Sequence, residues 1–255
     1  MLTIISPAKS LDFSIDERNI PYTTPEFTGE VNELVDLLRK KSTADIRKLM
    51  DVSENIAELN VERFENFKAR HQLPSSKQAI LAYSGDVYEE IEDQDFVDED
   101  FDFAQDHVRI ISGLYGLVKP LDLIQPYRLE MKIRLENSQG KNLYSFWKDK
   151  LTSSLAKAII DSGNDILINL ASAEYFKAID TNKLKARIIT PVFKEFRNGK
   201  YTVIGLKAKR ARGMMTDFII RKKINSPEQL KTFKKKKYTF NDSLSSEHEW
   251  VFSRG

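Results

Sequence analysis

Cysteine is absent from the 255-residue sequence, which has only three histidines, ten glycines and eight prolines. Without cysteine there are no disulfides, thiolate nucleophiles, iron–sulfur ligands or cysteine zinc sites, which fits a reducing cytosol. His71, His107 and His248 are far apart and form none of the spaced motifs that bind zinc. We therefore expect no metal site and no cofactor.

Long apolar runs are also missing. No stretch approaches the roughly 18 apolar residues of a membrane span, and the residues after Met1 lack the cationic start and apolar core of a signal peptide. Hydrophobic residues still make up 41% of the chain, with fifteen Phe and nine Tyr, which is ample for a core. We expect a soluble, cytoplasmic, globular protein in which residues 1–255 form one domain.

Strand-like and helix-like segments are mixed without regular alternation. Apolar runs predict buried strands at 2–5, 79–83 and 166–170. Helical periodicity predicts helices near 25–41, 43–50, 54–70, 98–107, 143–161 and 213–223. This pattern is typical of an α+β fold, one compact unit with a mixed sheet and surrounding helices.

Asn198-Gly199 is the strongest hairpin signal in the chain. It predicts a turn between strands at 186–196 and 201–208, and Pro191 predicts that the first of these lies at a sheet edge or bulge. A last strand is expected around 250–252.

Charge is divided unevenly along the chain. Residues 1–106 carry 11 basic and 24 acidic side chains, whereas residues 107–255 carry 29 basic and 14 acidic ones. Eleven of the acids lie between Asp86 and Asp106, a segment without a base. The basic half predicts an anionic partner, foremost a phosphate backbone. We expect the acidic segment to be a solvated face or a screen against indiscriminate binding, and Lys234–Lys237 to be an exposed tether.

The first candidate phosphate site contains Ser112, Gly113, Gly116 and Lys119. Two glycines three residues apart can turn the backbone sharply and present N–H groups to a phosphate, as a helix–hairpin–helix-like element does. The spacing fits neither a Walker A loop nor a dinucleotide fingerprint. The alternative is an ordinary tight turn that packs its leucines in the core.

A second candidate is the basic cluster of Lys207, Lys209, Arg210 and Arg212. We expect it where a strand ends and a helix begins, so that the cations line one groove. Arginine binds phosphate through two parallel hydrogen bonds. The alternative is a charged strand edge that prevents aggregation.

A third candidate comprises Tyr127, Arg128 and Lys132, where basic residues alternate with apolar and aromatic ones. A tyrosine beside an arginine can stack on a base while the arginine pairs with a phosphate. An amphipathic strand without a ligand gives the same alternation.

Ser6-Pro7-Ala8-Lys9 follows the first predicted strand. A Ser-x-x-Lys pair can be a nucleophile with its base, but Pro7 predicts a loop, so we favour Lys9 as an anion ligand. Polar residues near strand ends form an alternative pocket, in which an enzyme or a binding protein would take a small phosphorylated or carboxylated metabolite. Its members are Ser6, Lys9, Arg128, Asn169, Ser172 and Lys209.

With these motifs the chain resembles the YaaA family of bacterial peroxide stress resistance proteins. The segments that carry the resemblance are 6–13, 85–88, 100–105, 112–131, 169–177 and 207–213. The resemblance implies an α+β domain with a basic cleft and a helix–hairpin–helix-like element, located in the cytosol. It also implies DNA binding and a role in surviving hydrogen peroxide that is associated with limiting unincorporated iron.

We therefore expect a stress protein that binds duplex or single-stranded DNA largely independently of sequence, because backbone groups and cations contact phosphates. No catalytic residue is assigned, so a binding role is favoured over an enzymatic one. Neither a membrane nor an obligate protein partner is expected.

Overall fold

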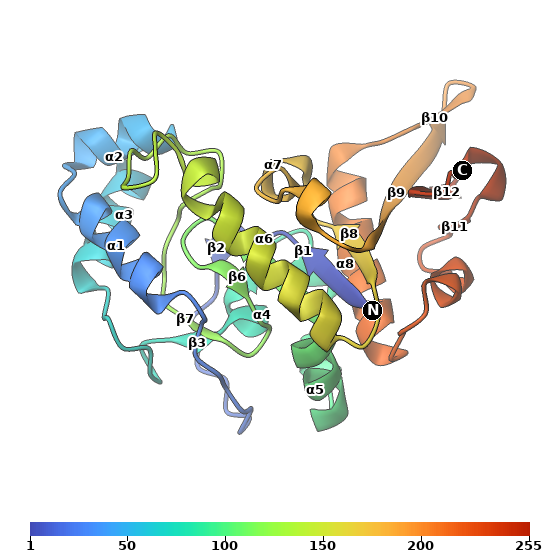
Figure 1. The fold of residues 1–255 in the computed structure, drawn as a ribbon, viewed down its shortest axis with the longest axis horizontal. Coiled ribbons are helices and arrows are strands. Elements are labelled where there is room, and N and C mark those ends of the chain that lie inside the picture. The colour runs from blue at the N-terminus through green and yellow to red at the C-terminus, as the bar shows by residue number, and fades with distance from the viewer.

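A mixed eight-stranded sheet runs through the centre of the computed structural model, which describes all 255 residues (Figure 1). Its strand order is β11-β12-β9-β8-β1-β5-β6, and β10 pairs with β9. The bounds are β1 (Leu2–Ile5), β5 (Val108–Ser112), β6 (Gly116–Val118), β8 (Ile166–Leu170), β9 (Arg187–Arg197), β10 (Lys200–Thr202), β11 (Thr239–Phe240) and β12 (Glu249–Arg254). The α+β class is confirmed, as are the predicted strands at 2–5, 166–170 and 250–252.

The five inner strands are parallel to one another. Strand β1 lies between β5 and β8, and its last residue, Ile5, pairs with Ile110 on one side and Leu170 on the other. Strands β8, β9 and β12 continue in the same direction, while β6, β10 and β11 are antiparallel to their neighbours. In the main sheet the chain continues from β1 to β5 on one side, and from β8 to β9 on the other side. The carboxyl ends of β1 and β8 therefore form a topological switch point, the place where α/β sheets bind ligands.

Helices surround this sheet, and several begin and end as predicted. The bounds are α1 (Thr28–Arg39), α2 (Thr43–Met50), α3 (Glu54–Asn66), α4 (Ala79–Ala82), α5 (Asp98–His107), α6 (Leu143–Asp161), α7 (Ala173–Phe176) and α8 (Gly205–Arg221). Five 3₁₀ turns, η1 (Tyr88–Glu90), η2 (Asp93–Asp95), η3 (Thr181–Lys183), η4 (Pro227–Thr232) and η5 (Asp242–Leu244), connect them. Short strand pairs β2 (Ser10–Leu11) with β4 (Tyr83–Ser84), and β3 (Lys77–Gln78) with β7 (Leu123–Ile124), lie outside the main sheet. None of the helices combines the length and apolar character needed to cross a bilayer.

Two predicted elements are wrong in type. Residues 79–82 form the short helix α4 rather than a strand, and all four are buried, so burial explains their apolar character. The strand expected over 201–208 ends at Thr202, and α8 begins at Gly205 instead of Gly213. Lysine, arginine and alanine are good helix formers, and Ala208 and Ala211 are buried on the inner face of this helix.

Pro191 lies inside the sheet rather than at its edge. Strand β9 has β8 on one side and β12 on the other, which corrects the expectation of an edge strand. The N–H of Thr190 donates to the carbonyl of His248 at 2.8 Å, so Pro191 turns its nitrogen away from β12. On that side, pairing with β8 stops at Ile189. Proline is tolerated because no neighbouring strand needs its missing donor.

Candidate anion-binding cleft

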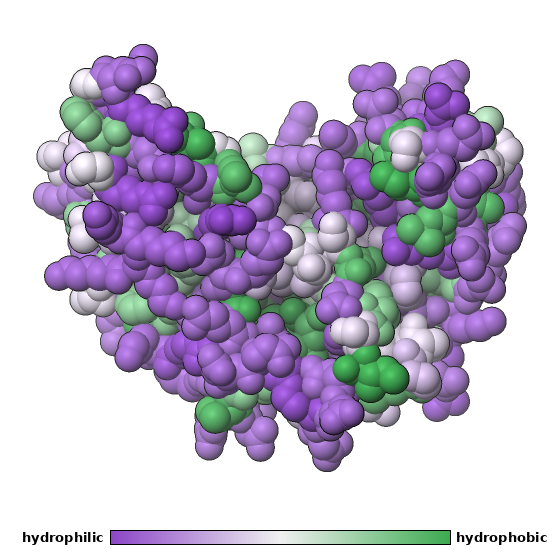
Figure 2. Space-filling model, turned by 180° about the vertical axis from the view of Figure 1, so that it is seen from behind, coloured by the Kyte–Doolittle hydropathy of each residue, from purple (hydrophilic) through white to green (hydrophobic).

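The molecule has two lobes with a hollow between them. One lobe contains α1, α2 and α3, and the other contains β9, β10 and β12, with α7 between them (Figure 1). The space-filling view from behind shows the hollow at the top, between mostly hydrophilic walls (Figure 2). The carboxyl end of β1 points toward this region (Figure 1). We call the hollow and its walls the cleft.

Residues that follow β1 and β8 meet at the edge of the sheet where the parallel strands end, which we call the carboxyl edge, and we take this edge as the floor of the cleft. The N–H of Ser172 donates to Oγ of Ser6 at 2.8 Å, and the two hydroxyls are 3.3 Å apart. The Asn169 side chain shapes the same loop by accepting from the Ala171 N–H at 3.1 Å. The predicted grouping of Ser6, Asn169 and Ser172 at strand ends is thus found in the structure.

A buried carboxylate lies beside these loops. Glu130 is 4% exposed, and its Oε1 lies 3.1 Å from Nζ of Lys9 and 3.2 Å from Nη2 of Arg128. Burial opposes ionisation, but the hydrogen bond from Lys9 and the charges of Arg128 and Lys9 hold the pKa of Glu130 below its usual value. Oε2 of Glu130 and Nε of Arg128 are buried without a hydrogen-bond partner. Lys9 therefore pairs with Glu130, and no hydrogen bond joins it to Ser6 as a catalytic dyad would require.

The Gly113–Gly116 turn is not a helix–hairpin–helix-like element. Strands β5 and β6 flank it, so it is a β-hairpin, and all of its residues are buried. The N–H groups of Leu114 and Tyr115 donate to Oγ of Ser112 at 3.2 and 3.0 Å. Because these donors are satisfied inside the protein, they are not free to hold a phosphate. This corrects the expectation for Ser112, Gly113 and Gly116.

The two glycines of this hairpin serve packing. A side chain at Gly113 would overlap the carbonyl of Leu129, so glycine lets the segment that carries Arg128 and Glu130 lie against the end of β5. At Gly116, where φ is +71°, a Cβ would lie 2.6 Å from the ring of Trp147. The tight-turn alternative is therefore the one that the structure supports.

Tyr127 and Lys119 do not face the cleft as candidate ligands. Tyr127 is buried, and its hydroxyl lies 2.6 Å from Oγ of Ser112 and 2.6 Å from the hydroxyl of Tyr83. Burial raises the pKa of Tyr127 to about 12. Lys119 follows β6, so it lies at the opposite edge of the sheet and lines a separate 250 Å³ cavity with Arg109. A base cannot stack on Tyr127 in this position.

The basic cluster of residues 207–212 occupies the first two turns of α8. Because the β9–β10 hairpin turns at the carboxyl edge, α8 begins at that edge. Lys207 pairs with Glu195 at 2.8 Å, and Lys209 lies 3.8 Å from Asp86. Arg210 lies 3.9 Å from Asp86 and 3.6 Å from Glu89.

Arg212 differs from these neighbours because no acidic group or hydrogen-bond acceptor pairs with its guanidinium. Burial alone lowers its pKa. The following glycine, Gly213, packs directly against the carbonyl of Val87, so its missing side chain serves the contact between α8 and η1.

The acidic segment packs against the basic half of the chain. Beyond the pairs at the start of α8, Glu90 binds Lys236 and Asp100 binds Lys223. Arg221, at the end of α8, lies 3.8 Å from both Glu92 and Asp95. Lys235 binds the fully buried Asp217 at 2.7 Å. Lys234, Lys236 and Lys237 are exposed as expected, but the ion pairs of Lys235 and Lys236 hold the segment against the protein, so it is not a free tether.

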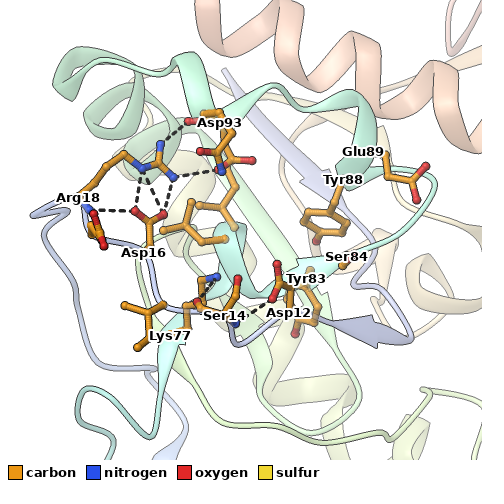
Figure 3. Close-up of a pocket in the computed structure, with 15 residues that line it drawn as sticks. Asp12, Ser14, Asp16, Arg18, Lys77, Tyr83, Ser84, Tyr88, Glu89 and Asp93 are labelled. Atoms are coloured by element: carbon orange, nitrogen blue, oxygen red, sulfur yellow. Dashed lines mark hydrogen bonds and ion pairs between the residues drawn. The ribbon is translucent and has the colours of Figure 1, made fainter.

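A 420 Å³ cavity lies on the acidic side of the molecule (Figure 3). Five carboxylates line it, against Arg18 and Lys77. Figure 3 shows the Arg18 guanidinium between Asp16 and Asp93, with an ion-pair distance of 3.2 Å to Asp93. The cavity does not suit a phosphate, and no group of three or more His, Cys, Asp or Glu side chains is arranged to hold a metal ion.

Two other cavities carry an excess of cations. A 480 Å³ cavity beside α2 is lined by Lys41, Lys48, Lys132 and Arg134 with two acids. A 570 Å³ cavity at the carboxyl ends of β9 and β12 is lined by Lys207, Lys236, Lys237 and Arg254 with one acid. The sequence indicates Lys132 and Lys207 as anion ligands, and Lys236 and Lys237 only as part of a tether. It does not indicate Lys41, Lys48 or Arg254, because they come from distant segments and share no spacing with the motifs.

The comparison with known families identifies the chain. The family model described as peroxide stress protein YaaA matches residues 1–244. The chain belongs to this family. The resemblance seen in the sequence is thereby confirmed, and family membership supports a role in the peroxide stress response.

Proposed function

We propose that this YaaA family member binds DNA across the cleft, through its phosphates and largely independently of base sequence. The observation that carries the proposal is the arrangement of cations at the carboxyl edge of the sheet. They come from the β1 loop, the segment after β7, α2 and the start of α8. A row of cations that track a backbone supplies non-specific affinity for nucleic acid.

The cations that lack acidic partners carry most of this argument. Arg212 has none, and the side chains of Lys132 and Arg134 are exposed without an ion pair. Lys209 and Arg210 are exposed, and their acids are 3.6 Å or more away. Exposed pairs of this kind contribute about 0–1 kcal/mol, so a phosphate can compete for these cations.

The link between this binding and iron belongs to the same proposal. The resemblance associates the family with limiting unincorporated iron and oxidative DNA damage. We propose that the protein protects by binding DNA itself, because DNA is the target of the radical damage.

The test compares Arg212→Gln with Arg187→Gln, an exposed arginine at the amino end of β9, on the opposite edge. Fluorescence anisotropy with a labelled duplex, repeated over a series of salt concentrations, measures the affinity and its salt dependence. We expect Arg212→Gln to weaken binding about threefold to tenfold on every sequence and to lower the salt slope by about one. Arg187→Gln should bind normally. Absence of duplex binding at low salt, or binding insensitive to salt, would refute the proposal.

A second candidate function is binding of a small phosphorylated or carboxylated metabolite at the floor. The incompletely paired polar atoms of Arg128 and Glu130 beside the switch point favour it. Binding of such a molecule in the absence of any DNA affinity would favour this candidate over the first.

A further inference from the structure

At the floor of the cleft two cations pair with one buried carboxylate, and a third cation lies near them. Lys9 and Arg128 both pair with Oε1 of Glu130. Arg63 on α3 is half-buried without an ion pair. Burial and the nearby charge of Arg128 lower its pKa, and the charge of the exposed Glu62 on the same helix opposes this only in part. We call Lys9, Arg63, Arg128 and Glu130 the Arg128 cluster; it carries three cations and one anion.

The cluster is open on one side. The Lys9 side chain is 60% exposed, whereas that of Arg128 is 18% exposed and that of Glu130 is 5% exposed. An anion can therefore approach beside Lys9 and come to rest against the guanidinium of Arg128. Gly113 and the hydrogen bonds of Tyr127 fix the position of the segment that carries Arg128 and Glu130.

The excess charge of this cluster matches one kind of phosphate. A phosphomonoester carries about −1.5 to −2 charges at pH 7, whereas each internal phosphate of a nucleic acid carries one. A phosphomonoester has one ester link, so it can enter a recess end-on, while an internal phosphate is tied to a sugar on both sides. Arginine is the side chain best suited to such a group because its planar fork binds two oxygens.

We infer that the Arg128 cluster is a subsite for a phosphomonoester, such as the terminal phosphate of a broken DNA strand. That the ligand is a DNA strand rests on the proposed function, whereas the binding of a phosphomonoester does not. A small phosphorylated molecule offers the same group, so the experiment separates these two sources.

The probes are two labelled oligonucleotides of one sequence, ending in a phosphate or in a hydroxyl, together with unlabelled phenyl phosphate. Anisotropy should show about tenfold tighter binding of the phosphorylated strand, the contribution of one additional charged hydrogen bond. Phenyl phosphate should remove this preference by competition. Arg63→Gln should reduce the preference without exposing a carboxylate, and Arg128→Lys should reduce it while keeping Glu130 paired.

Arg187→Gln is the matched control and should keep the full preference. Equal binding of the two strands by the unmodified protein would overturn the subsite and leave general DNA binding intact. If neither strand binds, calorimetry with phenyl phosphate alone tests whether the cluster binds a phosphomonoester. Binding that Arg63→Gln and Arg128→Lys both weaken would support a subsite for a small molecule, and no binding would overturn it. A preference unchanged in both variants would place the phosphate elsewhere and also overturn the assignment.

Discussion

At the scale of single residues, three glycines determine where the segments of the proposed site lie. Gly113 allows the backbone of Leu129 to lie against β5, Gly116 adopts a positive φ under Trp147, and Gly213 allows α8 to contact Val87. In the sequence, two of these glycines indicate a phosphate turn. The structure assigns all three to close packing, because the surfaces that a side chain would meet are protein and not solvent.

Gly116→Ala should therefore destabilise the fold and leave DNA affinity unchanged. The new Cβ would require a positive φ and would displace the Trp147 ring, which should cost about 3 kcal/mol of unfolding free energy. Urea unfolding and DNA titration on one preparation provide the measurement. Gly199→Ala, which has a positive φ but open space around it, controls for the backbone strain alone. A stable Gly116→Ala protein with weakened DNA binding would restore the turn to the binding site.

At the scale of elements, the sequence predicts those segments whose pattern is local. Helices 43–50, 98–107 and 143–161 and strands 2–5 and 166–170 agree with their predicted bounds because periodicity and caps define them. Helix 79–82 could not be told from a strand, since a short run buried all round has no period. The cations of the proposed site were predicted only in part, because Arg63, Lys41 and Lys48 come near Arg128 and Lys132 through packing between distant segments.

The start of α8 is tied to the sheet by Glu195, and this tie should depend on pH. Burial of Glu195 raises the pKa of its carboxyl group, but hydrogen bonds from Lys207, Tyr238 and Arg254 outweigh it and lower the pKa from 4.5 to about 2. The stabilisation is complete above pH 4.5, where the unfolded carboxyl is also ionised, and is lost as the pH falls from 4.5 through about 2. Unfolding free energies measured across this range should decline less steeply in Glu195→Gln. At neutral pH the unfolding free energy of this variant should be lower by about 3–5 kcal/mol. A loss below about 1 kcal/mol would show that Glu195 does not hold α8 to the sheet.

At the scale of the whole molecule, the two oppositely charged parts of the chain pack against each other. The net charge is only +2, and the acidic segment lies along α8 and the Lys235–Lys236 turn. Much of the anionic partner that the basic half predicts is therefore supplied by the protein itself. What remains for an external ligand is the carboxyl edge, where the loops of β1 and β8 diverge and cations exceed acids.

Removing the acids nearest this edge should strengthen DNA binding. Asp86→Asn with Glu89→Gln would free Lys209 and Arg210 from their only acidic neighbours. We expect affinity for duplex DNA to rise severalfold and the salt slope to become steeper by about one to two, as two further cations reach phosphates. Stability should change by less than about 1 kcal/mol, because these pairs are exposed.

The matched control is Asp98→Asn with Glu99→Gln, which makes the same change in net charge at the exposed start of α5. It should raise affinity only slightly, since no ion pair joins these acids to a cation of the cleft. If both double variants strengthen binding equally, net charge alone accounts for the effect. In that case the acidic segment does not compete with DNA for α8, and Lys209 and Arg210 do not belong to the interface.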